Sequence, residues 1–126
     1  MKKKILILED DSVFSFILKK SLEKLGFCAV IANNATQVLD IALKESIDLF
    51  LFDLSVGHEN GFEILGRLRK LFPELKAIAS TGRIVENWKK YNIQGFLIKP
   101  YPIQELDLML KNIFCEKSDM NIQFSH

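Results

Sequence analysis

The chain has 126 residues, 48% of them apolar and 26% charged, which is enough for one compact domain with an ordinary core and leaves no room for a second. Its 17 basic and 16 acidic side chains give a formal net charge of +1, which excludes a global electrostatic attraction to nucleic acid or to an anionic membrane. Cys28 and Cys115 form no CxxC pair, and the apolar run Ile5–Leu8 is too short for a signal peptide or a membrane span. We therefore expect a cytoplasmic protein in a reducing compartment.

Short apolar runs alternate with longer amphipathic segments, which indicates repeated strand–helix units and a parallel sheet. The predicted strands are Lys4–Leu8, Phe27–Ala32, Asp48–Phe52, Lys76–Ser80 and Gly95–Ile98. The predicted helices are Ser12–Leu25, Ala35–Lys44, Phe62–Leu71, a short Val85–Tyr91 and Ile103–Phe114. We expect Ser12 to cap the first helix, Gly26 to end it and Asn34 to cap the second. Residues 1–114 are predicted to form the domain and residues 115–126 a flexible tail.

Charged and hydroxyl side chains follow the carboxyl ends of these strands, where sites form in an open parallel sheet. In chain order they are Glu9, Asp10, Asp11, Asp53, Thr81 and Lys99. Carboxylates held close together repel one another unless a cation lies among them. Oxygen ligands without histidine or paired cysteine favour magnesium. Any one of these acids taken alone is better explained as a helix cap or a loop residue, so the prediction of a metal site depends on their convergence.

Four segments at these strand ends resemble the receiver domain of two-component response regulators, and the resemblance covers roughly Lys4 to Phe114. The segments are Ile5–Asp11, Asp48–Asp53, Ser80–Gly82 and Gly95–Tyr101. The resemblance implies an α/β, flavodoxin-like (βα)5 three-layer sandwich with a parallel five-stranded sheet in the order 2-1-3-4-5. It also implies a signalling switch that catalyses only its own phosphoryl transfer and dephosphorylation, rather than an enzyme acting on a separate substrate.

The resemblance assigns roles to the acidic residues. It implies that Asp53 accepts a phosphoryl group from a phosphohistidine of a sensor histidine kinase or a histidine phosphotransfer protein, in an Mg²⁺-dependent reaction. Asp10, Asp53 and the backbone carbonyl of Ser55 are expected to bind the metal, and Glu9 to reach it through water. An ionised carboxylate attacks phosphorus without a general base, so the surroundings of Asp53 need only supply electrostatic stabilisation.

Three further residues receive roles from the same resemblance. Lys99 is expected to bind a phosphoryl oxygen, and a cis Lys99–Pro100 bond is expected to direct its ammonium over Asp53. Thr81 and the aromatic Phe96 are expected to act as switch residues that respond to phosphorylation. The altered surface would be formed by the fourth predicted helix, the strand containing Phe96 and the last helix, where a second copy or an effector docks.

The sequence departs from the family pattern in several places. Val56-Gly57 replaces the usual Met-Pro pair after the phosphorylated aspartate, and Asn60 replaces the acid before the turn glycine, so we expect a more mobile loop. Thr81 lies only 18 positions before Lys99, so we expect the fourth helix to be reduced to a turn or two. The segment leading to Lys99 is similar to receivers of hybrid sensor kinases, although the chain begins with Met, and both a stand-alone and an excised receiver fit this pattern.

Three other classes fit parts of the pattern. A flavodoxin-like electron carrier needs a hydroxyl- and glycine-rich phosphate loop where this chain has three acids. A haloacid-dehalogenase-type phosphatase needs a second aspartate two residues after the first, and that position is Ser55. The main alternative is a receiver-fold interaction module that works without phosphorylation, and the complete set of Asp10, Asp53, Thr81 and Lys99 argues against it.

Overall fold

A parallel β-sheet forms the centre of the computed structural model, which describes residues 2–115. Its strands are β1 (Lys4–Leu8), β2 (Cys28–Ala32), β3 (Leu49–Asp53), β6 (Lys76–Thr81) and β7 (Gly95–Ile98). The strand order is β2-β1-β3-β6-β7 and every neighbouring pair is parallel. The predicted order 2-1-3-4-5 is therefore confirmed.

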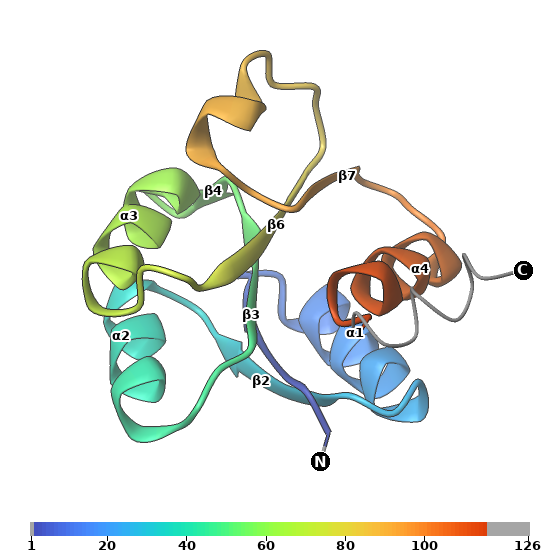
Figure 1. Cartoon of the computed structure of the whole chain (residues 1–126). Coiled ribbons are helices and arrows are strands. Elements are labelled where there is room, and N and C mark those ends of the chain that lie inside the picture. The colour runs from blue at the N-terminus through green and yellow to red at the C-terminus, as the bar shows by residue number, and fades with distance from the viewer. Residues whose placement is uncertain (1, 116–126) are drawn as a thin grey trace, which may run out of the picture.

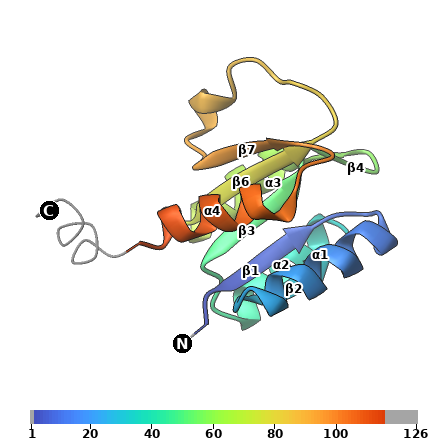
Figure 2. The same ribbon diagram turned by 90° about the vertical axis from the view of Figure 1, so that its right-hand side faces the viewer.

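Within the described residues, four α-helices cover the two faces of the sheet. Helices α1 (Ser12–Lys24) and α4 (Ile103–Ile113) lie on one face, and α2 (Ala35–Lys44) and α3 (Gly61–Leu71) lie on the other (Figures 1 and 2). This is the predicted three-layer sandwich. Within residues 2–115, no helix has both the length and the apolar character needed to cross a membrane.

Strand β1 shows why the strand sequences are apolar throughout. Leu6 and Leu8 pack into the core beneath α2 and α3, whereas Ile5 and Ile7 pack into the core beneath α1 and α4. All four side chains are at most 1% exposed. Because successive residues of a strand point to opposite faces, a strand covered on both sides needs apolar residues at every position.

The four α-helices have the predicted ends to within one residue: α1 ends at Lys24 and not Leu25, α3 begins at Gly61 and not Phe62, and α4 ends at Ile113 and not Phe114. The predicted cap Ser12 is wrong: Asp11 is the N-cap, and its Oδ1 accepts the backbone N–H groups of Val13 and Phe14, each at 3.0 Å. Asp11 is extended and directly precedes the helix, so its side-chain oxygen reaches the first amides, which Ser12, already inside the helix, does not. Asn34 caps α2 as predicted, and Gly26 follows α1 with φ of +98°.

The segment between β6 and β7 contains no α-helix. It has a single 3₁₀ turn, η1 (Trp88–Tyr91), which confirms that the fourth helix is reduced. Figure 1 shows this segment projecting beyond the β7 edge of the sheet. The guanidinium of Arg69 on α3 donates hydrogen bonds to the backbone carbonyls of Leu75, Tyr91 and Asn92, at 2.6–3.1 Å. Burial lowers the pKa of Arg69. The hydrogen bonds of this guanidinium connect η1 to α3.

The loop after β3 forms a short hairpin, and the expectation that this loop is more mobile stays a prediction. Strands β4 (Ser55–Val56) and β5 (Glu59–Asn60) pair antiparallel around a turn at Gly57, whose φ is +60°. The sequence did not predict this hairpin, because two residues per strand are too few for a periodic sequence signal. The predicted flexible tail remains a prediction, since residues 116–126 lie outside the described part of the chain.

Candidate functional site

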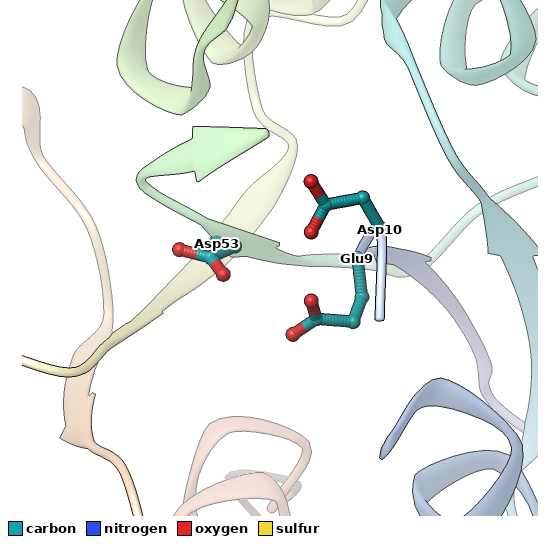
Figure 3. Close-up of side chains that lie close together, drawn as sticks. All are labelled: Glu9, Asp10 and Asp53. Atoms are coloured by element: carbon teal, nitrogen blue, oxygen red, sulfur yellow. The ribbon is translucent and has the colours of Figure 1, made fainter. Parts of the chain in front are cut away.

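Three carboxylates meet at the carboxyl edge of the sheet. Glu9 and Asp10 directly follow β1, and Asp53 is the last residue of the neighbouring strand β3. One carboxylate oxygen from each lies within 4.8 Å of the others, and Figure 3 shows the three side chains grouped around a common space. This confirms the prediction that Glu9, Asp10 and Asp53 lie close together.

The three acids differ in burial and in hydrogen bonding. Glu9 is only 3% exposed, and its Oε2 accepts the backbone N–H of Asp11 at 3.1 Å. Asp10 is exposed, and its Oδ2 accepts the backbone N–H of Gly57 at 3.1 Å. Asp53 is half-buried, and its Oδ1 accepts the backbone N–H of Ser55 at 3.2 Å. Asp53 therefore combines access from solvent with a fixed orientation.

Lys99 supplies the positive charge of the site, from the residue directly after β7. Its Nζ donates to Asp53 Oδ2 at 3.0 Å and also to Glu9 Oε1. Burial alone lowers the pKa of Lys99, but the hydrogen bonds and charges of Glu9 and Asp53 outweigh burial, so the pKa is raised. Lys99 is thus held protonated against two of the three acids. The Lys99–Pro100 bond is cis, as predicted.

Thr81 is the last residue of β6 and is 7% exposed. Together with Ser55, His58, Arg83 and neighbouring residues, it lines a pocket of about 480 Å³ between the β4–β5 hairpin and the start of the η1 segment. The hydroxyls of Ser55 and Thr81 therefore border the same space as the imidazole of His58 and the guanidinium of Arg83.

Phe96, the other predicted switch residue, does not line this pocket. It is half-buried, pairs with Ala79 across the sheet, and its ring stacks on Trp88 at 5.7 Å between centroids. Thr81 pairs with Ile98, so it lies two positions along the β6–β7 ladder from the pair that Ala79 forms with Phe96.

Two residues that the sequence analysis did not single out also shape the site. A side chain on Gly61 would place its Cβ 2.3 Å from the backbone oxygen of Asp53, so only glycine lets α3 begin this close to β3. The ring of Phe14 on α1 lies 4.7 Å from Lys99 Nζ, and Tyr101 packs edge-on against that ring. Gly61 is the turn glycine that follows Asn60 in the sequence, but no local sequence signal places Phe14 next to Lys99.

The donor set fits a small divalent cation. Carboxylate oxygens are the ligands that Mg²⁺ prefers, and the described residues place no histidine or cysteine among them. A cation here would relieve the repulsion among the three acids, which Lys99 relieves for only two of them. Asp11, the fourth acid of this region, is occupied as the cap of α1.

The fold and the arrangement of acids agree with the comparison to known families. A model of the response regulator receiver domain matches residues 5–111, and the chain therefore belongs to this family of two-component signalling domains. The acidic cluster is typical of the magnesium site of receivers.

Several known proteins are similar to the whole domain. Sporulation initiation phosphotransferase F of Bacillus subtilis (strain 168) is 29% identical over 94% of this chain and 99% of that protein. A solved CheY-like receiver domain protein from Methanospirillum hungatei JF-1 has 28% identity and a TM-score of 0.81, covering 89% of this chain and 93% of that chain. The response regulator TrrA from Thermotoga maritima, solved in complex with Mg(2+)-BeF, has 23% identity and a TM-score of 0.80, covering 89% and 99%.

Other curated relatives are longer. The chain spans about half the length of several proteins described as transcriptional regulators, between 46% and 59% of each. Receivers as a family interact with histidine kinases and phosphotransferases, which fits the predicted class of partner. The similarity to receivers of hybrid sensor kinases stays a prediction.

Proposed function

We propose that this chain is a phosphorylation-activated switch that accepts a phosphoryl group on Asp53 from a phosphohistidine of a sensor kinase or a histidine phosphotransfer protein. The observation that carries the proposal is the position of Asp53, half-buried at the end of β3 between two other acids and the Lys99 ammonium. Membership of the receiver family and the likeness to a phosphotransferase over its full length support it.

Among the three acids, Asp53 is the best nucleophile. Glu9 is only 3% exposed, which keeps its carboxylate from a phosphoryl donor, and Asp10 Oδ2 accepts the backbone N–H of Gly57 in the hairpin. Asp53 keeps 17% of its side chain exposed. In the proposed transfer, a bond forms between an Asp53 carboxylate oxygen and phosphorus while the bond from phosphorus to the histidine nitrogen breaks. The imidazole nitrogen leaves with the electron pair, and no general base is needed.

Asp10, Asp53 and the backbone carbonyl of Ser55 would hold the magnesium ion, with Glu9 reaching it through water. The ion supplies charge neutralisation at the transferring phosphoryl oxygens when it is bound. A protein of the same fold is described in complex with Mg(2+)-BeF, which supports the assignment. Lys99, which bonds to Asp53 Oδ2, would shift to a phosphoryl oxygen once the acyl phosphate forms.

The signal would leave through Thr81 and Phe96. Thr81 would turn its hydroxyl toward the phosphoryl group, and Phe96 would change its packing against Trp88. The surface affected is formed by η1, β7 and α4, where we propose that a second copy or an effector protein docks. No direct contact with nucleic acid or a membrane is part of this proposal.

The test is intact-mass analysis of the full chain after incubation with acetyl phosphate and Mg²⁺. The wild-type chain should gain the mass of one phosphoryl group, and the gain should be absent in Asp53→Asn and after removal of the metal with EDTA. A wild-type chain that stays unmodified, while a known receiver reacts under the same conditions, would favour the alternative of an interaction module that works without phosphorylation.

A further inference from the structure

The β4–β5 hairpin touches the proposed magnesium site through its turn. The backbone N–H of Gly57 donates to Asp10 Oδ2 at 3.1 Å, with Gly57 in the left-handed region at φ of +60°. Gly57 occupies the position where the family pattern has proline. Because proline carries no backbone N–H, this hydrogen bond depends on the departure from the pattern.

The other strand of the hairpin is attached to α2. Glu59 Oε1 accepts the backbone N–H of Ala35, the first residue of α2, at 3.0 Å. The first amides of a helix have no partner within the helix, and α2 has no acidic residue in its own first turn. Asn34 accepts the N–H of Gln37, and Glu59 accepts that of Ala35, so two of the first amides of α2 have a side-chain partner. The carboxylate of Glu59 also places negative charge at the positive end of the helix dipole.

The hairpin needs such an anchor because it is short. Each strand has only two residues, and isolated two-stranded hairpins are marginal in water. Val56 is 3% exposed and fixes one side of the hairpin in the core, whereas Glu59 pairs with Val56 across the hairpin and reaches outward to α2. The position of the turn therefore depends on Val56 and on the Glu59 contact.

We propose that Glu59 is a positioning residue for the magnesium site, a role that rests on the proposed function. By holding the hairpin against α2, Glu59 keeps the Gly57 N–H on Asp10 and keeps Ser55, which belongs to the same hairpin, beside Asp53. Two of the proposed metal ligands, the Asp10 carboxylate and the Ser55 carbonyl, are thus oriented by one side chain that touches neither the metal nor the phosphoryl group. Outer partners of this kind commonly determine how well ligands bind a metal.

Titration calorimetry with Mg²⁺ on the full chain tests the proposal. Glu59→Ala should bind Mg²⁺ about fivefold more weakly than wild type, the effect expected from losing one orienting hydrogen bond. Glu59→Gln keeps an acceptor oxygen at the same reach and should restore most of the affinity. Asn34→Ala is the matched control, because it removes a cap from the same helix and leaves the hairpin contacts in place.

Amide hydrogen exchange of the metal-free chain provides a second readout that does not depend on activity. The Gly57 amide should exchange faster in Glu59→Ala and at the wild-type rate in Asn34→Ala. Equal Mg²⁺ affinities and equal Gly57 exchange in wild type and Glu59→Ala would overturn this proposal and leave the proposed function intact. Equal losses of affinity in Glu59→Ala and Asn34→Ala would also overturn it, because they would reflect the stability of α2 alone. A wild-type chain that binds no Mg²⁺ would refute the metal-dependent function as well.

Discussion

Replacing Lys99 with methionine tests how strongly the acidic site depends on its internal cation. Methionine keeps an apolar stem that packs near Phe14 but lacks the ammonium that bonds to Glu9 and Asp53. The Glu9 side chain is 4% exposed and that of Asp53 17%, so neither carboxylate regains full hydration. Removing one partner of a buried ion pair costs about 3–5 kcal/mol, and since the Lys99 side chain is 22% exposed we expect about 2–3 kcal/mol here.

The loss should be measured by urea unfolding of the metal-free chain, followed by circular dichroism near neutral pH. Lys111→Met is the matched control, because Lys111 Nζ also lies 3.0 Å from a carboxylate, Asp107 Oδ2, and the Asp107 side chain is 18% exposed, close to the 17% of Asp53. The two pairs differ in the lysine, whose side chain is 64% exposed for Lys111 and 22% for Lys99. The control should lose less than about 1 kcal/mol. Equal losses in the two variants would refute the reasoning that burial makes the Lys99 contacts strong.

The pH dependence of this difference has a defined sign. Because the folded-state pKa of Lys99 is raised above 10.5, its stabilisation is fully present below about pH 10.5. The stabilisation is lost as the pH rises through the folded-state pKa. The stability difference between wild type and Lys99→Met should therefore stay constant from neutral pH to about pH 10 and shrink above that range. A difference that shrinks already between pH 7 and pH 9 would contradict the raised pKa.

Three further predictions concern the metal, the η1 turn and the switch. Asp10→Ala should abolish Mg²⁺ binding in titration calorimetry, and wild-type affinity in this variant would remove Asp10 from the ligand set. Arg69→Ala leaves three backbone carbonyls without their guanidinium donor and should cost about 2–3 kcal/mol with faster amide exchange in η1; unchanged exchange there would show that other contacts hold the turn. Beryllofluoride with Mg²⁺ should shift the amide resonances of Thr81, Phe96 and α4, and shifts confined to the loops around Asp53 would exclude the proposed output surface.

The fold and the convergence of acids were predictable because both follow from strand boundaries. Strands covered on both faces must be apolar along their length, so their ends are visible in the sequence. Residues that follow parallel strands meet at one edge, which places Glu9, Asp53 and Lys99 together without any knowledge of side-chain packing. The spacing between Thr81 and Lys99 also predicted the reduced fourth helix correctly.

The contacts that refine the site were not predictable, because they join residues far apart in the chain. Glu59 reaches Ala35 across 24 positions, and Arg69 reaches Tyr91 across 22. Neither side chain follows a local pattern that names its partner. Asp11 caps α1 because its backbone is extended, whereas Ser12 is already helical. Both residue types are good caps, so the sequence does not show at which of the two positions the helix begins.

The central claim, that Asp53 carries the phosphoryl group, is tested most directly by locating the modified residue. Borohydride reduces an aspartyl phosphate to homoserine, so the wild-type chain can be treated with acetyl phosphate and Mg²⁺, reduced, digested and sequenced by mass spectrometry. Homoserine is expected at position 53, with Asp10 unmodified. Reduction at position 10, or a phosphoryl group found on a serine, threonine or histidine, would contradict the assignment of Asp53 as the acceptor.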